Sequence, residues 1–174
     1  MVPELKLITE PAHESAPAPE FAAALSSLAS GVVLVTCRVG GRPWGMTVTA
    51  FTSVSADPPL VLVSLGADST ATRAILASRR FGISVLADGQ EGVARHGSRP
   101  GAPKFIDRLD VPGALAHLEC ELHDAIEVAD HSILIGRVVS TSVTTDGEAL
   151  VYHRRAYRTV SDLETTEEMR CLSS

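Results

Sequence analysis

Residues 45–64, which read GMTVTAFTSVSADPPLVLVS, decide the fold of this chain. Two strand-like segments lie on either side of Asp57-Pro58-Pro59, a sequence that interrupts extended structure. The first segment carries threonine and serine at positions where a buried strand normally carries branched aliphatic residues. Small hydroxylated side chains leave room for a flat ligand beside the strand.

The alternation in this segment predicts one hydroxyl-bearing surface. If residues 42–55 form a single strand, Thr47, Thr49 and Phe51 all face the same side. Threonine is also common on strand faces that are exposed to solvent. The pattern alone therefore leaves two interpretations open, a ligand-binding surface and an ordinary exposed face.

Outward from this stretch, the sequence predicts many short strands and few helices. Gly40-Gly41 separates apolar residues 32–39 from residues 42–55, as in a hairpin. A helix is expected to begin at Pro19 and to stop before Gly31, with an apolar stripe of Phe21, Leu25 and Leu28. A helical turn is expected at residues 90–95 and a loop at residues 96–104. Further strands are predicted at residues 60–65, 81–86, 116–123, 133–139 and 149–152. This pattern is typical of a mainly β protein that forms a closed or nearly closed antiparallel barrel.

The 174 residues suit one folded domain, which we place at residues 19–160. Residues 1–18 contain three prolines and are predicted to form a flexible N-terminal arm, and acidic residues 161–174 a C-terminal tail.

Composition argues against several classes of partner. The net charge is −6 and there is no block of lysine and arginine, so neither nucleic acid nor an anionic membrane surface is an expected partner. No apolar run approaches the length of about 18 residues that spans a bilayer, and we expect a cytoplasmic protein. Three cysteines without a Cys-x-x-Cys pair indicate neither a disulfide framework nor a thiolate metal cluster.

Common catalytic motifs are also missing. The sequence contains no glycine-rich dinucleotide loop, phosphate-binding loop, Gly-x-Ser-x-Gly elbow or His-Glu-x-x-His motif. His117 and His123 share a predicted strand face, but six residues of strand separate them by roughly 20 Å, so we predict no metal site. Cys120 lies on the opposite, apolar face and is expected to be a buried small hydrophobic residue.

A second hydroxyl-rich segment follows residue 64. Ser69 and Thr70 stand at the start of a predicted short helix, where free N–H groups and the helix dipole favour a phosphate group. The same residues are also suited to an ordinary helix cap, and this choice stays open.

Several segments, taken in chain order, resemble the flavin reductase family of split-barrel FMN-binding proteins. The resemblance covers roughly residues 21–157. It rests on Gly45-Met46-Thr47, residues 51–55, residues 57–63, the Ser69-Thr70 segment, residues 81–86, Lys104-Phe105, Leu118-Glu119-Cys120, Asp130-His131-x-Ile133-x-Ile135-Gly136 and Leu150-Val151-Tyr152. Ser84 replaces the usual small residue or asparagine, and the loop at residues 96–104 is short, so this chain departs from the family at two places.

The resemblance implies an antiparallel split β-barrel with a few short peripheral helices, which acts as a homodimer and binds flavin near the subunit interface. It implies an NAD(P)H:flavin oxidoreductase that transfers a hydride from nicotinamide C4 to flavin N5 and supplies reduced FMN or FAD to a separate flavin-dependent monooxygenase.

The resemblance also assigns site residues. Thr47, Thr49, Ala50 and Phe51 would line the isoalloxazine ring, and Ser53 and Ser55 would lie near the ribityl chain or phosphate. Ser64, Ser69 and Thr70 would hold the phosphate, Lys104 and Phe105 would close over the flavin, and His131 would position the nicotinamide. Arg154 and Tyr157 are expected at the far rim, and Trp44 either on the ring or as a plug in the barrel mouth.

Two other functions remain open at this point, a flavin- or haem-binding split barrel that does not reduce its ligand and a dimeric interaction module. The absence of an obvious arginine pair for a 2′-phosphate favours NADH over NADPH. The sequence does not distinguish FMN from FAD, substrate flavin from tightly bound flavin, or one partner oxygenase from another.

Overall fold

The computed structural model describes residues 16–144 and 146–160. Residues 1–15 of the predicted arm and the whole predicted tail, 161–174, lie outside the described residues, so both domain boundaries stay predictions. The elements, in chain order, are α1 (Ala18–Ser26), β1 (Ser30–Gly31), β2 (Val33–Val39), β3 (Arg42–Val48), β4 (Phe51–Ala56), β5 (Pro59–Gly66), α2 (Thr70–Ser78), β6 (Arg80–Val85), α3 (Glu91–Ser98), β7 (Ala116–Val128), β8 (His131–Val143), β9 (Leu150–His153) and β10 (Ala156–Thr159).

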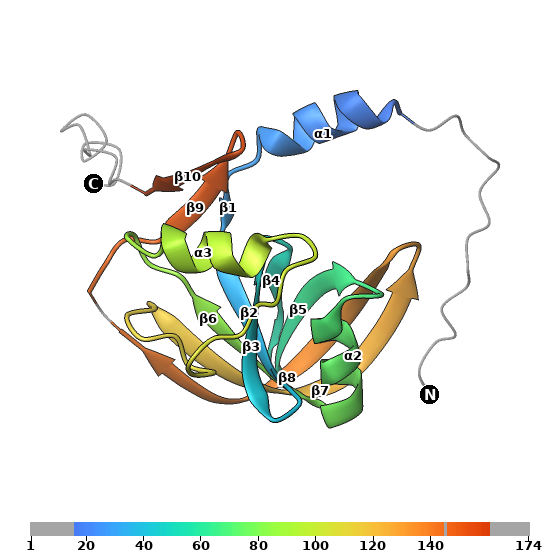
Figure 1. Ribbon diagram of the computed structural model, residues 1–174, viewed down its shortest axis with the longest axis vertical. Coiled ribbons are helices and arrows are strands. Elements are labelled where there is room, and N and C mark those ends of the chain that lie inside the picture. The colour runs from blue at the N-terminus through green and yellow to red at the C-terminus, as the bar shows by residue number, and fades with distance from the viewer. Residues whose placement is uncertain (1–15, 145, 161–174) are drawn as a thin grey trace, which may run out of the picture.

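A curled antiparallel sheet of seven strands forms the body of the molecule (Figure 1). Its strand order is β3-β2-β6-β7-β8-β5-β4, and a second sheet of β1, β9 and β10 lies beside it. β3 and β4 occupy the two opposite edges although only Thr49 and Ala50 separate them in the chain. The two edges must therefore meet, and the sheet closes on itself as a barrel. The predicted mainly β, antiparallel barrel is confirmed.

The prediction of one continuous strand at residues 42–55 is wrong. β3 pairs with β2, whereas β4 pairs with β5 on the other edge, and the chain changes direction at Thr49 and Ala50. At this junction the Ser64 N–H donates to the Ala50 carbonyl, with an N to O distance of 3.0 Å. Pairing with two different neighbours, which local alternation does not encode, overrides the expected straight strand.

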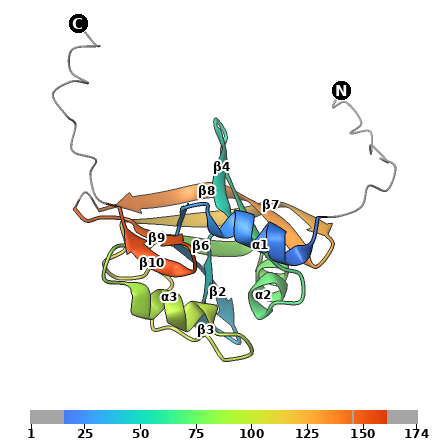
Figure 2. The same ribbon diagram turned by 90° about the horizontal axis from the view of Figure 1, so that it is seen from above.

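The barrel interior is filled by alternate residues of the strands. Val35, Val63, Ile83 and Leu134 are fully buried in one cluster, and Ile75 of α2 packs into the same cluster. A second cluster under α3 includes Leu34, Ala94 and Leu150. The helices α2 and α3 thus cover the β2–β3 hairpin from two sides (Figures 1 and 2).

The predicted capping of α2 is confirmed. The Ser69 hydroxyl accepts a hydrogen bond from the Thr72 N–H at 3.0 Å, which satisfies one of the free donors at the helix start. Two other helix predictions need correction. α3 continues to Ser98, so the first three residues of the predicted 96–104 loop are helical, and α1 ends at Ser26 rather than near Gly31.

The apolar stripe of α1 is exposed. Phe21 and Leu25 retain 59% and 55% of their accessible surface, and Leu28, just beyond the helix, retains 62%. Within the described residues, none of the helices combines the length and the apolar character that crossing a bilayer requires.

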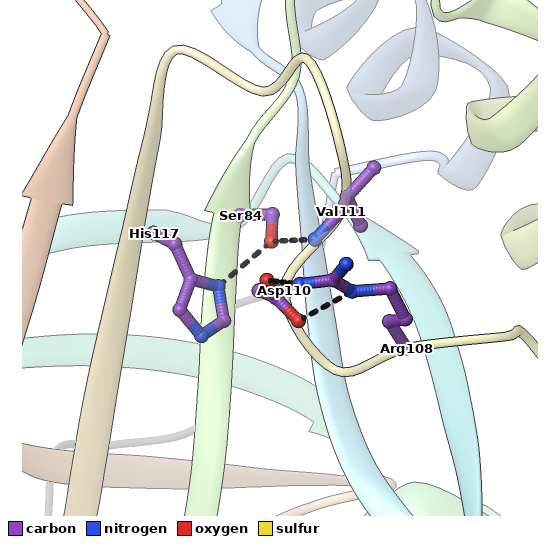
Figure 3. A network of polar contacts seen from close by, with 5 residues as sticks. All are labelled: Ser84, Arg108, Asp110, Val111 and His117. Carbon is purple, nitrogen blue, oxygen red and sulfur yellow. Dashed lines mark hydrogen bonds and ion pairs between the residues drawn. The ribbon is translucent and has the colours of Figure 1, made fainter.

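A polar network fastens the loop after α3 to the outer face of the sheet (Figure 3). The Ser84 hydroxyl lies 2.9 Å from Nδ1 of His117 and accepts from the Val111 N–H at 3.3 Å. In the same loop the Arg108 guanidinium forms an ion pair with Asp110 and donates hydrogen bonds to its carboxylate. These hydrogen bonds lower the pKa of the Asp110 carboxyl. His117 is thus part of a structural contact between β6, β7 and the loop.

The two glycines of α3 provide a test of this packing. A β-carbon added at Gly97 would lie 2.7 Å from Leu34 Cδ1 and 2.9 Å from the Thr47 nitrogen, whereas one added at Gly92 would meet no atom within 4 Å. Gly97→Ala should therefore destabilise the protein by about 1–3 kcal/mol, because α3 must move off β3. Gly92→Ala should be neutral or should stabilise by up to about 1 kcal/mol. Urea denaturation of both variants checks this, and equal stabilities would contradict the packing.

Candidate functional site

A cleft of about 440 Å³ opens where the two edges of the barrel separate. One wall is formed by residues 46–50 at the end of β3, and another by residues 64–66 at the end of β5 together with His131 of β8. Arg95 of α3 and Tyr157 of β10 contribute to the remaining side. This volume falls within the range of roughly 300–1,000 Å³ that is usual for small-molecule sites. We call it the main cleft.

Small residues keep the main cleft open. Thr49, Ala50, Ser64 and Gly66 all line it, and a β-carbon added at Gly66 would meet no atom within 4 Å. A flat ring can therefore approach the backbone of both walls closely. The structure brings together the predicted ring-lining residues Thr49 and Ala50 with Ser64 and His131.

Two other predicted ring residues are used by the fold. The Thr47 hydroxyl donates to the Ala94 carbonyl of α3 at 2.8 Å, so Thr47 lines the cleft but its hydroxyl holds the helix. Phe51 packs against the barrel core and does not line the cleft. Thr49 is therefore the threonine of this segment that presents its side chain to solvent beside the cleft.

A second hollow, of about 550 Å³, adjoins the main cleft and shares Met46 with it. It contains the predicted residues Ser69, Thr70, Lys104 and Phe105. The Ser69 hydroxyl is already occupied, because it caps α2 and lies 2.8 Å from the Thr72 hydroxyl. An anion there can be held by the free N–H groups at the start of α2, by Thr70 and by the Lys104 ammonium. We call this the lysine hollow.

Trp44 and Phe105 form the inner wall of the lysine hollow. Their rings meet edge to face with centroids 5.0 Å apart, and the Arg42 guanidinium lies 3.9 Å from the Phe105 centroid. Trp44 is 8% exposed and packs in the barrel core, which agrees with the expected plug of the barrel mouth.

Ser53 and Ser55 lie on β4 and line neither hollow. The β4–β5 hairpin projects from the face of the sheet opposite to the helices (Figure 2). Arg154, expected at the rim, also lines neither hollow, whereas its neighbour Arg155 and the expected Tyr157 line the main cleft.

His131 stands at the entrance of the main cleft with half of its side chain exposed. Its Nδ1 lies 2.8 Å from an oxygen of Asp130, and this hydrogen bond lowers the pKa of the Asp130 carboxyl. With Nδ1 as the donor to the carboxylate, this hydrogen bond favours one orientation of the imidazole.

Sequence patterns missed Arg95, Arg155 and Tyr152, which also line the main cleft. Arg95 and Arg155 are 60 positions apart, and only the packing of α3 beside β9 and β10 brings them to one cleft (Figure 1). The adjacent arginines at 154 and 155, which lie in a two-residue turn, were the sequence signal that could have indicated a positively charged site.

Neither thiol chemistry nor a protein-held metal is suggested by the described residues. Burial raises the pKa of Cys37 to about 11 and that of Cys120 to about 12, so both thiols stay neutral near pH 7. Cys120 is 2% exposed, as expected for a small hydrophobic residue. Among residues 16–144 and 146–160, no three histidine, cysteine or acidic side chains lie close enough to hold a metal ion together.

Comparison with known proteins gives a consistent result. Residues 25–161 match the family model described as "Flavin reductase like domain". The chain is 38% identical over 139 residues to the reductase component of 4-hydroxyphenylacetate 3-monooxygenase from Thermus thermophilus, covering 79% of this chain and 93% of that protein. It is 37% identical over 143 residues to an NADH-dependent FAD reductase from Streptomyces globisporus, covering 74% of this chain and 78% of that protein.

A solved structure shares the fold. The Streptomyces globisporus NADH:FAD oxidoreductase SgcE6, in complex with NAD and FAD fragments, superposes with a TM-score of 0.76 at 31% identity. The alignment covers 82% of this chain and 92% of that chain. The split-barrel fold is therefore confirmed, and this chain belongs to the flavin reductase family.

Proposed function

We propose that this protein is an NADH-dependent flavin reductase that reduces FMN or FAD and supplies the reduced flavin to a separate flavin-dependent monooxygenase. The observation that carries the proposal is the main cleft, whose lining brings the small residues Thr49, Ala50 and Ser64 together with His131. The relatives named above, a reductase component of a monooxygenase and an NADH-dependent FAD reductase, support it.

The residues present fit a flavin. Small side chains on both walls of the main cleft leave space for the ring, and the lysine hollow offers Lys104 and Thr70 to a phosphate group beyond Met46. Bound flavin accepts a hydride at N5 from C4 of the dihydronicotinamide. This transfer requires no strong acid or base, so the protein must align two rings and exclude water. A cleft lined by threonine, alanine and serine suits this chemistry, because it needs no titrating side chain at the reacting atoms.

His131 is proposed to position the nicotinamide at the cleft entrance. Asp130 holds the imidazole through Nδ1, so Nε2 is left to face a ligand. Because half of the side chain is exposed, the ring can contact a second substrate that enters over the flavin.

A homodimer is proposed through the outer face of β5, β7 and β8. Leu62 and Ile133 alternate with the buried Val63 and Leu134, so they face outward. Nearby, Ile126 is 48% exposed, and the three helices lie on the other side of these strands (Figure 2). An uncovered apolar face of this kind is typical of a protein interface. It adjoins the main cleft, since Ser64 and His131 belong to the same strands. Sedimentation velocity that finds only monomers would contradict the dimer.

A cytoplasmic location also remains a proposal. It is supported by Cys37 and Cys120, which are both free thiols.

The direct test of the function is an assay with the purified protein, NADH and either FMN or FAD. We expect NADH oxidation that depends on added flavin. Under anaerobic conditions the visible absorbance of the oxidised flavin should be lost at the same time. A yellow protein that binds flavin without consuming NADH would instead select the non-catalytic carrier, and a colourless protein without flavin affinity the interaction module.

Substitution of Thr49 tests the position of the ring. Thr49→Leu puts a larger side chain on the cleft wall and should reduce turnover at least about 100-fold while the unfolding midpoint changes little, because Thr49 is exposed. The matched control is Thr52→Leu on β4, which lies outside both hollows and should keep full activity. Unchanged flavin affinity in Thr49→Leu would refute this placement.

Substitution of His131 tests the nicotinamide side. His131→Ala should raise the KM for NADH about tenfold, equivalent to ~1.4 kcal/mol of binding free energy, and should leave the flavin Kd unchanged. His123→Ala is the control, since His123 is an exposed residue of β7 outside the main cleft. If both variants behave like the unmodified protein, His131 has no role in nicotinamide binding.

A further inference from the structure

The turn between β9 and β10 contains two arginines in an unfavourable backbone conformation. His153 pairs with Ala156, so Arg154 and Arg155 form a two-residue hairpin turn. Their φ angles are +48° and +61°, in the left-handed region that side chains with a β-carbon disfavour. Glycine or asparagine is the usual occupant of both positions in such a turn.

The same molecule shows the usual solution elsewhere. The β2–β3 hairpin also has a two-residue turn with positive φ angles, +58° and +79°, and its residues are Gly40 and Gly41. Backbone conformation alone therefore favours glycine at residues 154–155 as well. An arginine kept against this preference points to a role for its side chain.

Of the two arginines, Arg155 lines the main cleft and Arg154 does not. Arg95 of α3 lines the same cleft, and its guanidinium carbon lies 5.1 Å from the centroid of the Tyr157 ring. A guanidinium that stacks on an aromatic face keeps its in-plane N–H groups free for an oxyanion. Tyr157 in turn packs on Tyr152 with ring centroids 5.2 Å apart, which supports this end of the cleft.

The charges at this end favour an anion. Arg95 and Arg155 line the cleft with His131, whose neighbour Asp130 is bound to Nδ1, and no acidic residue lines it among the described residues. Neither arginine forms a salt bridge within residues 16–144 and 146–160. The chain as a whole carries a net charge of −6, so this is a local concentration of positive charge.

We propose that Arg95 and Arg155 form a phosphate-binding subsite for the diphosphate of the nicotinamide dinucleotide. This inference rests on the proposed function. The proposed function assigns the flavin phosphate to the lysine hollow, which shares Met46 with the main cleft, so a second anion site within the cleft is left for the second nucleotide. Arginine suits a diphosphate because its planar group donates two parallel hydrogen bonds.

The test compares Arg155→Gly with Arg154→Gly, two variants of the same turn. Each variant replaces an arginine at positive φ with glycine, which adopts this conformation without strain, so both should raise the Tm by about 1–4 °C. Arg155→Gly should raise the KM for NADH about tenfold or more, through loss of a charge-assisted hydrogen bond, while Arg154→Gly leaves it unchanged. The KM for 1-benzyl-1,4-dihydronicotinamide, which has no phosphate, should be the same in all three proteins.

Several outcomes would overturn the proposal. An unchanged KM for NADH in Arg155→Gly would do so. An equal rise in the KM for the benzyl compound would do so too. A rise in KM that is confined to FAD, with the KM values for FMN and NADH unchanged, would assign the arginines to the adenylate part of the flavin. A rise in KM that is confined to NADPH would assign them to a 2′-phosphate.

Binding of ADP-ribose separates this inference from the proposed function. Isothermal titration of the unmodified protein and the two variants needs no hydride transfer, and Arg155→Gly should weaken ADP-ribose binding about tenfold or more. If the unmodified protein oxidises no NADH yet shows this pattern, the proposed function fails and the anion subsite stands. If it oxidises NADH but ADP-ribose binds all three proteins equally, only the subsite fails.

Discussion

The whole architecture depends on two sheet edges that are joined by two residues. β3 and β4 lie at opposite ends of the seven-stranded order, yet Thr49 and Ala50 connect them directly. Because so short a link cannot cross an open sheet, the sheet must curl until its edges meet. The edges meet without forming a continuous ladder, and the main cleft lies where residues 46–50 face residues 64–66. The topology that closes the barrel therefore also creates the site.

The packing outside the barrel fixes what lines that site. The Thr47 hydroxyl bonds the Ala94 carbonyl, and Gly97 lets α3 approach β3 more closely than any side chain would permit. These contacts hold α3 beside β9 and β10, where Arg95 reaches Tyr157. A threonine expected to touch a ligand thus contributes indirectly, by positioning the helix that supplies an arginine.

Local sequence signals predicted those features that depend on neighbouring residues. The Gly40-Gly41 hairpin, the Ser69 cap and the buried Cys120 each follow from propensity or alternation over a few positions, and each was confirmed. Signals of this kind could not show that residues 42–55 change partner at Thr49, because strand pairing is set by the whole sheet.

The site was predictable only in part, for the same reason. Thr49, Ala50, Ser64 and His131 were found through the resemblance to a known family, and the structure brings them to one cleft. Ser53 and Ser55 share that sequence segment but follow β4 away from it. Arg95 and Arg155 come together only through the packing of α3 against a distant hairpin, which no local pattern records.

One residue at the rim of the main cleft departs from what local stability favours. The cleft wall carries Thr49 and Ala50 at a break between strands, and its rim carries an arginine in a turn that favours glycine. The β2–β3 turn meets the same backbone requirement with Gly40 and Gly41, whereas Arg79 and Ala129 also adopt positive φ angles without being glycine. The Arg79 side chain has a structural partner, because its guanidinium donates to the Leu122 carbonyl at 2.8 Å. Arg155 instead lines the main cleft and forms no salt bridge among the described residues, so its unfavourable backbone conformation supports a role of its side chain in binding a ligand.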